Sequence, residues 1–340
     1  SRAMLMGVAI GDALGAPFEF LSRRCKNFDG TLMGVSKRIS QWNFQFELAY
    51  GQVTDDTEMT ITTLEALVRG YTPEKALELY HAFVNSDTCC LGNNTSKLLK
   101  GYSRKNLFNA YAIKYFKDDD SMENAQSNGH LMRASPFSLI KDPELRSYLV
   151  ECDTRLTNPS TVSLQCVKIY VDALAYLLHA EAPDIRAWIK TIDATRLHDH
   201  VKEAITDAST EEFTRNVDEG CKGWTCHSFA IALWVVKHAI SFTDGMIKVI
   251  RRKGDTDTNA AISGALLGAR FGYRAMNDET ITQANITTIL SCKPYIRKKN
   301  LDKLTNLPRT TFFDMNQHFS SIENSIFTIS QSPSHLRRKH

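Results

Sequence analysis

The chain has 340 residues and carries 41 basic and 38 acidic side chains, which gives a formal net charge of +3. Hydrophobic residues make up 43% of the sequence and charged residues 23%, as in ordinary globular proteins. This composition excludes a disordered chain, a fibre and a small scaffold held by disulfides, and a chain of this length can bury a full core.

The first predicted element is a helix within Gly7–Phe20, which Pro17 ends. Three glycines of this segment recur every four residues. Because glycine costs a helix about 1 kcal/mol relative to alanine, close packing against another element must compensate. Glu19 follows in the next turn, between two phenylalanines. It is either a solvated turn residue or a carboxylate held at the edge of a pocket.

A long surface loop is expected over Arg23–Gly51, where alternating strand patterns are brief. Two amphipathic helices are predicted next, over Glu58–Val68 and Glu74–Val84. The first of them comes directly after the segment Thr54-Asp55-Asp56-Thr57, which places carboxylates and hydroxyls at a helix start.

A second long loop is expected over Lys117–Asn128 and ends in the turn Asn128-Gly129-His130-Leu131. The backbone N–H groups of such a turn can hold an anion, although an ordinary connection between a loop and a helix has the same signature. Long apolar helices are then predicted over Val162–Ala180 and Trp224–Ile240. The second is apolar nearly all round and is therefore expected at the centre of the molecule.

The last predicted helix, Ala260–Phe271, again carries glycines at four-residue spacing and follows the segment Gly254-Asp255-Thr256-Asp257-Thr258. Clear strand signals are missing from the sequence, so we expect an all-α fold. Without a linker or an internal repeat, residues 1–330 are expected to form a single domain and residues 331–340 a frayed tail.

Two acidic segments thus open helices that are about 200 residues apart in the sequence. Each segment taken alone is explained by helix capping, since Thr and Asp satisfy the first N–H groups and complement the helix dipole. The density of carboxylates at both helix starts, with no basic partner nearby in the sequence, nevertheless predicts that Asp55, Asp56, Asp255 and Asp257 converge on one site. Four carboxylates around one pocket would need a cation to remain ionised. Oxygen ligands of this kind suit Mg²⁺, and two metal ions would resolve the repulsion.

Four segments together resemble the ADP-ribosylglycohydrolases, the group that includes dinitrogenase-reductase-activating glycohydrolase. They read GVAIGDALGAPFEF at Gly7–Phe20, GQVTDDTEMT at Gly51–Thr60, NGHLMRASP at Asn128–Pro136 and GDTDTNAAISGALLGARFG at Gly254–Gly272. They occur in the order and at the spacing of that family.

The resemblance implies an all-α protein that holds two Mg²⁺ ions, with Mn²⁺ as a substitute. By motif, the implied metal ligands are Thr54, Asp55, Asp56, Asp255, Asp257 and Thr258. The implied catalytic residues are Glu19, Asp55 and Asp56. The turn Asn128, Gly129, His130 and Leu131 would hold the diphosphate and distal ribose, and Trp224 would stack on substrate, with a core tryptophan as the alternative.

The sequence departs from the family pattern at several positions. Asn158 replaces the imidazole of a Thr-His-Pro segment as the implied substrate contact, and Ser127 stands in place of a glycine. Cys90 occupies a position where the branch that cleaves ADP-ribosyl-arginine commonly has Asp. The acceptor linkage therefore stays open between arginine, serine, O-acetyl-ADP-ribose and a nucleic-acid end.

The expected function is metal-dependent hydrolysis of the glycosidic bond between ADP-ribose and a modified acceptor, so the substrate would be an ADP-ribosylated protein or an ADP-ribose derivative. Two alternatives remain: an inactive ADP-ribose-binding or structural protein on the same fold, and a metal phosphohydrolase that acts on a nucleotide diphosphate. Retention of all six oxygen-ligand positions favours the hydrolase of the glycosidic bond.

Composition also bears on compartment and partners. The eight cysteines form no C-x-x-C pattern, and we expect reduced thiols in the cytoplasm. The longest apolar run, Phe229–Val236, is less than half of the about 20 residues that a membrane-spanning helix needs. Basic residues form small scattered clusters rather than one stripe, so neither a membrane nor a nucleic acid is expected as a partner.

Overall fold

The computed structural model describes residues 1–20, 25–33, 35–39, 44–86, 91–92, 95–96, 99 and 123–292. Its helices confirm the predicted all-α class. In chain order they are α1 (Arg2–Gly15), α2 (Asp55–Val68), α3 (Pro73–Val84), α7 (Pro143–Arg155), α8 (Thr161–His179), α9 (Ile185–Ile189), α10 (Asp199–Ser209), α11 (Thr225–His238), α12 (Phe242–Ile250), α13 (Thr256–Asp278) and α14 (Thr280–Ser291). Short 3₁₀ turns lie at Ala16–Phe18, Cys25–Asn27, Asn128–His130 and Ser135–Leu139.

A β-hairpin lies within the segment that the sequence predicts as a loop. Strands β1 (Val35–Ile39) and β2 (Phe44–Leu48) pair antiparallel, with Val35 opposite Leu48. The sequence of β2 alternates apolar and polar residues, but over five positions only, which is too short to decide between a strand and a loop. The expectation of an uninterrupted loop over residues 23–51 was therefore wrong.

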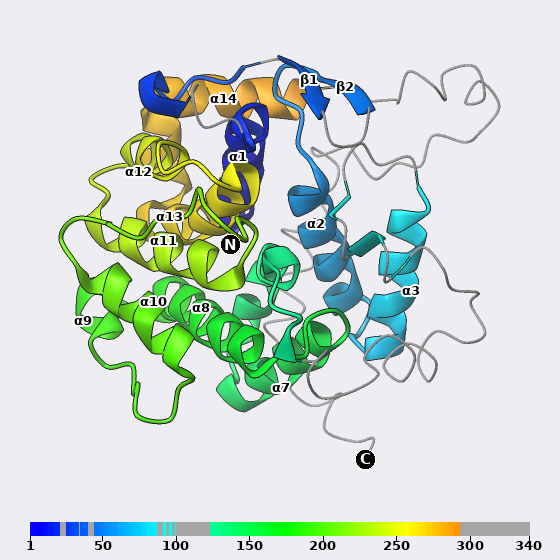
Figure 1. The fold of residues 1–340 in the computed structure, drawn as a ribbon, viewed down its shortest axis with the longest axis vertical. Helices are drawn as coiled ribbons and strands as arrows, with labels where there is room; N and C mark the ends of the chain where they lie inside the picture. The colour runs from blue at the N-terminus through cyan, green and yellow to red at the C-terminus, as the bar shows by residue number, and fades with distance from the viewer. Residues whose placement is uncertain are drawn as a thin grey trace.

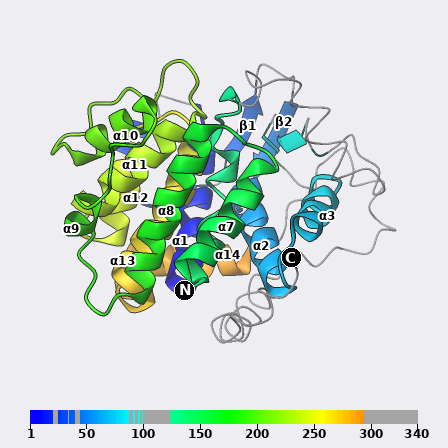
Figure 2. The same ribbon diagram turned by 90° about the horizontal axis from the view of Figure 1, so that it is seen from below.

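Helix α13 packs against α1, α11 and α12 near the middle of the structure (Figure 1). Helices α2 and α3 lie on one side of α1, and α9 to α12 lie on the other, as both ribbon views show (Figure 2). Helix α11 is buried from Thr225 to Val236, which confirms the expected central position of this apolar segment.

The four-residue glycine spacing allows α1 and α13 to approach each other closely. A Cβ atom added to Gly7 would lie 2.0 Å from the carbonyl oxygen of Gly264, and one added to Gly264 would lie 2.1 Å from the oxygen of Gly7. The same holds for Gly11 against Ala260. The backbones are thus in direct contact, which confirms the close packing that the sequence predicts.

This contact brings the end of α1 beside the start of α13. The hydroxyl of Thr256 donates a hydrogen bond to the carbonyl oxygen of Gly15 at 2.8 Å. The backbone N–H of Phe20 donates to the oxygen of Gly254 at 3.0 Å. The turn that carries Glu19 is therefore held against the turn that carries Asp255.

Two helices, α13 and α2, have boundaries that differ from the predicted ones. Helix α13 continues to Asp278 beyond the predicted end, with a kink at Gly272, whose φ of 80° leaves the helical region. Helix α2 begins at Asp55 rather than Glu58, so its acidic residues lie inside the first turn. The tail predicted for residues 331–340 lies outside the described residues.

Helix α8 alone, among the described helices, is long and apolar enough to cross a membrane by length and composition. The core helix of a globular protein meets the same criterion, and 56% of the apolar stretch of α8 is buried inside the protein. This is weak evidence for a span, and the expected absence of a membrane partner stays a prediction.

Candidate active site

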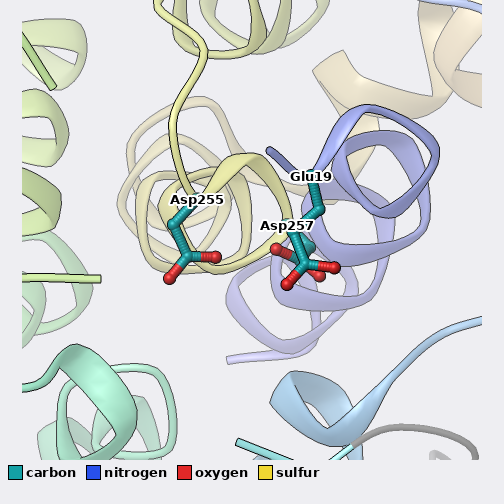
Figure 3. A group of neighbouring side chains, drawn as sticks. All are labelled: Glu19, Asp255 and Asp257. Carbon is teal, nitrogen blue, oxygen red and sulfur yellow. The ribbon is translucent and has the colours of Figure 1, made fainter. Parts of the chain in front are cut away.

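Three carboxylates gather where the end of α1 meets the start of α13. One oxygen from each of Glu19, Asp255 and Asp257 lies within 4.8 Å of the others. Figure 3 shows Asp255 and Asp257 leaving the start of α13 while Glu19 approaches from the turn after α1. Gly254 has a φ of 73°, so the chain turns sharply into this helix start.

The acidic start of α2 faces the same region. Asp55 and Asp56 lie in the first turn of α2 and both are buried. The pKa of Asp56 is raised well above its ordinary value, first by burial and then by the negative charges of neighbours that include Asp257 and Asp255. The two acidic segments are thus within electrostatic reach of each other despite their separation in sequence.

Asp12 anchors the start of α2 from α1, and the sequence analysis missed it. Its carboxylate accepts hydrogen bonds from the N–H and hydroxyl of Thr54 at 2.8 and 2.7 Å, and from those of Thr57 at 3.1 and 2.5 Å. The side chain is completely buried, and burial raises its pKa. One available signal was a charged residue inside the otherwise apolar run Ile10–Leu14.

Glu19 and the carboxylates of the two helix starts, Asp55, Asp56, Asp255 and Asp257, together form an acidic cluster whose oxygen atoms fit a hard cation. Burial is the main cause that raises the pKa of Asp55 and of Asp255 to about 6, so ionising both is costly without a positive charge nearby. Neither Asp55 nor Asp56 forms an ion pair with a described basic side chain, and Oδ1 of Asp56 has no hydrogen-bond partner among the described residues. Buried carboxylate oxygens of this kind are the ligands that Mg²⁺ prefers.

The two threonines expected as metal ligands lie beside these carboxylates, Thr54 at the start of α2 and Thr258 at the start of α13. The hydroxyl of Thr54 donates to Asp12 and lies 3.3 Å from Oδ2 of Asp56. Thr258 is buried in the first turn of α13, and its N–H donates to Oδ1 of Asp257 at 3.0 Å. Both hydroxyl oxygens therefore belong to the segments that carry the carboxylates.

The predicted substrate turn lies beside the acidic cluster. The amide Nδ2 of Asn128 donates to Oδ2 of Asp255 at 2.9 Å and to the hydroxyl of Ser228 at 3.0 Å. The backbone N–H of Asn128 donates to the oxygen of Gly223 at 2.9 Å. Asn128 therefore links the turn directly to a carboxylate of the cluster.

The side chains of His130 and Leu131 point into the protein, since both residues are completely buried. Nδ1 of His130 lies 3.0 Å from the carbonyl oxygen of Ser127, and burial lowers the pKa of His130 to about 3, so that the ring is neutral. These two residues can meet a ligand through their backbone, and their side chains support the turn.

Asn158 and Trp224 also support the segment before this turn. The Asn158 amide lies 3.0 Å from both the carbonyl and the hydroxyl oxygen of Ser127, and Asn158 is buried. Nε1 of Trp224 donates to Oε1 of Gln126 at 2.8 Å, while the Arg215 guanidinium lies 5.1 Å from its ring centroid. These contacts explain both residues without a ligand. Cys90 lies outside the described part of the chain.

Comparisons with known proteins match most of the chain to one family. The family model described as ADP-ribosylglycohydrolase matches residues 1–305. A solved structure titled as an ADP-ribosylglycohydrolase-related protein complex has a TM-score of 0.59 and 22% identity, with 85% of this chain and 94% of that one covered. At that identity the match supports the fold alone.

Relatives of known name cover most of this chain. A protein of Acanthamoeba polyphaga mimivirus, named for the same family, is 25% identical, and the match covers 88% of this chain and 93% of its own. An ADP-ribosylarginine hydrolase of Serratia proteamaculans is 22% identical and covers 85% of this chain and 77% of its own. The ADP-ribosyl-[dinitrogen reductase] glycohydrolase of Rhodospirillum rubrum is 25% identical, with 78% and 84% covered.

Proposed function

The chain belongs to the ADP-ribosylglycohydrolase family, and we propose that it hydrolyses the bond between the distal ribose of ADP-ribose and an acceptor group. The observation that carries this proposal is the gathering of the buried carboxylates of Asp255 and Asp257 with that of Glu19 beside the Asn128 turn. A sugar that loses its leaving group develops positive charge, and carboxylates stabilise that charge. The turn beside them offers backbone groups to the rest of the nucleotide.

We propose that the cluster holds two Mg²⁺ ions, for which Mn²⁺ can substitute. The ligands would be Thr54, Asp55 and Asp56 from α2, and Asp255, Asp257 and Thr258 from α13. When bound, the ions would lower the pKa of coordinated water and hold the vicinal hydroxyls of the ribose. The orphaned oxygen of Asp56 supports this assignment.

The acidic side chains would have separate roles in the reaction. Glu19, at the more exposed edge of the cluster, would accept a proton from the attacking water as the oxygen bonds to the anomeric carbon. The bond from that carbon to the acceptor breaks, and the acceptor leaves with the electron pair and takes up a proton. Asp55 and Asp56 would stabilise the developing positive charge. The products are ADP-ribose and the unmodified acceptor.

A panel of substrates tests this function. ADP-ribosyl-arginine protein, ADP-ribosyl-serine peptide, O-acetyl-ADP-ribose and ADP-ribosylated nucleic acid are each incubated with Mg²⁺ or with a chelator, and free ADP-ribose is measured. We expect release from at least one substrate with Mg²⁺ and its loss with chelator. Binding of ADP-ribose without any release would instead identify a binding protein, and phosphate release with an intact glycosidic bond would identify a phosphohydrolase.

Single ligand substitutions test the cation site. Asp55→Ala or Asp257→Ala should abolish turnover while the protein stays folded, because the large apolar core is untouched and an acidic residue in the first turn of a helix contributes only about 0.3–1 kcal/mol through the helix dipole. Calorimetric titration with Mg²⁺ should show weakened binding in both variants. Near-full activity of either variant at saturating Mg²⁺ would remove that residue from the ligand set.

A further inference from the structure

Arg133 lies four residues after Gly129 and is completely buried. Its Nε donates to Oδ2 of Asp153 at 2.9 Å, and Nη2 donates to the carbonyl oxygen of Asp153 and to the hydroxyl of Thr157 at 3.1 and 3.0 Å. The remaining nitrogen, Nη1, donates to the carbonyl oxygen of Gly129 at 3.0 Å. Every nitrogen of the guanidinium group is thus engaged, and one of them reaches the predicted substrate turn.

The opposite end of this ion pair is fixed by two tyrosines. Oδ1 of Asp153 accepts hydrogen bonds from the hydroxyls of Tyr71 and Tyr80 at 3.0 and 2.7 Å. The Tyr80 hydroxyl also lies 2.6 Å from that of Thr63 in α2, and its ring lies 4.9 Å from the Arg133 guanidinium carbon. Three helices, α2, α3 and α7, therefore hold the guanidinium in one orientation.

A buried ion pair is a poor source of stability, because apolar side chains of similar volume often serve as well. An apolar side chain could fill this space, but it could not donate to the Gly129 carbonyl. Since a peptide group is planar, fixing that oxygen also fixes the peptide plane between Gly129 and His130. The charge at position 133 thus provides a specific support for the backbone of the turn.

We propose that Arg133 is a positioning residue that holds the turn Asn128–Leu131 in its ligand-binding conformation. This inference rests on the proposed function, in which the turn binds the nucleotide part of the substrate. The side chain of Asn128 is bonded to Asp255, and Arg133 holds the carbonyl oxygen of the next residue, Gly129. Of the two groups that this turn would hold, the diphosphate takes no part in the bond that breaks, so we expect distortion of the turn to weaken binding more than it slows the reaction.

Arg133→Lys tests the proposal with Arg146→Lys as the matched control. Lysine keeps the charge beside Asp153 but cannot reach Asp153, Thr157 and Gly129 together. Arg146 is also buried, pairs with Asp172 at 2.9 Å and donates to the carbonyl oxygen of Ile140 at 2.8 Å, away from the turn. Both variants lose a forked contact to a carboxylate and a carbonyl, and only the first loses the contact to Gly129.

The readouts are the Kd of ADP-ribose by calorimetry, KM and kcat on the cleaved substrate, and the melting temperature. We expect Arg133→Lys to raise Kd and KM about tenfold, equal to about 1.4 kcal/mol, with kcat within about threefold. Arg146→Lys should change neither Kd nor KM. A purely structural role of Arg133 would lower the melting temperature and the active fraction and leave Kd and KM unchanged, which would overturn the inference.

Arg133→Met combined with Asp153→Asn covers the case in which the lysine variant fails to fold. This pair removes both charges together, and the new amide oxygen still accepts from the two tyrosines, so no lone charge is buried. The same rise in Kd and KM is expected. If the unmodified protein binds no ADP-ribose, the proposed function fails; if it binds and the variants bind equally well, only the role of Arg133 fails.

Discussion

Glu19 is the partly exposed member of the acidic cluster, and the two carboxylates nearest to it, Asp255 and Asp257, are buried. It follows a 3₁₀ turn that Pro17 helps to form, so its side chain is not part of a helix face. A carboxylate that enters a site from its edge can take a proton from water and pass it to solvent. This position favours a role in proton transfer over a role in holding the ligand.

Glu19→Gln should therefore separate the chemical step from binding. The substitution keeps the shape of the side chain, and we expect kcat to fall by roughly 10²–10⁴, the usual contribution of a positioned acid or base. The Kd of ADP-ribose should stay within a few-fold. Single-turnover cleavage and equilibrium binding, measured on the same preparation, decide the matter, and unchanged cleavage would remove Glu19 from the mechanism.

Asp12 offers a second prediction at the scale of one residue. Asp12→Asn replaces an acceptor oxygen by an N–H₂ group among four donors, so we expect the free energy of unfolding to fall by about 1–3 kcal/mol. Mg²⁺ affinity should fall too, because Thr54 loses its anchor. The control is Asp29→Asn, since exposed Asp29 accepts in the same way from the N–H and hydroxyl of Thr31. A change of at most about 0.5 kcal/mol is expected there.

Denaturant unfolding and calorimetric titration check the Asp12 prediction. If Asp12→Asn were as stable as Asp29→Asn and bound Mg²⁺ normally, Asp12 would not position the start of α2.

At this scale the sequence predicted the acidic segments well, because Thr and Asp at a helix start leave a local signature. It did not predict that Asp12 anchors Thr54 and Thr57, or that Asn158 and His130 support a turn. Those roles depend on partners that lie 31 or more residues away in sequence, or on burial, and neither is visible in a local pattern.

At the scale of helices, the contact between α1 and α13 fixes the position of Glu19 relative to Asp255 and Asp257. Gly264→Ala would place a methyl group 2.1 Å from the backbone oxygen of Gly7, and backbone cannot move aside without separating the helices. We expect this variant to lose at least about 2–3 kcal/mol of stability, in spite of the better helix propensity of alanine. Activity should fall as well, because the cluster spans both helices.

Gly245→Ala is the matched control on α12. There the added methyl group would lie 2.5 Å from Cδ1 of Leu267 and 3.2 Å from Cβ of Ala239, so the buried Leu267 side chain must shift but no backbone carbonyl blocks the methyl group. We expect Gly245→Ala to lose less stability than Gly264→Ala, about 1 kcal/mol, because repacking a core side chain costs about 1–3 kcal/mol and alanine regains about 1 kcal/mol of helix propensity. Equal destabilisation of the two variants in thermal or denaturant unfolding would contradict the view that backbone contact fixes the two helices.

Elements with a long apolar period, such as α8 and α11, were predicted to within two residues at each end. The hairpin β1–β2 was not, because its strands have only five residues each. The convergence of the two distant helix starts was predicted from their density of carboxylates alone. The pairing of α1 with α13 was not, because the glycine spacing predicts close packing but does not identify the partner helix.

The whole molecule should respond to pH through the buried cluster. The pKa values of Asp55 and Asp255 are raised from 3.8 to about 6. The folded protein thus holds these protons more tightly than the unfolded chain, so without a cation the cluster's contribution to stability falls as the pH rises from about 4 to about 6. Other groups titrate in the same pH range, so the test compares stability with and without Mg²⁺ at each pH.

Mg²⁺ binds the ionised carboxylates and competes with the protons, so its stabilising effect should grow with pH over the same range. At a concentration about 100-fold above Kd, a single site adds about 2.7 kcal/mol. We expect the melting temperature with Mg²⁺, minus that with chelator, to be several degrees at about pH 7.5 and much smaller at about pH 5. Asp257→Ala should reduce this difference at the higher pH, which separates site binding from a general salt effect. An equal difference at both pH values would mean that the cation does not bind through these carboxylates.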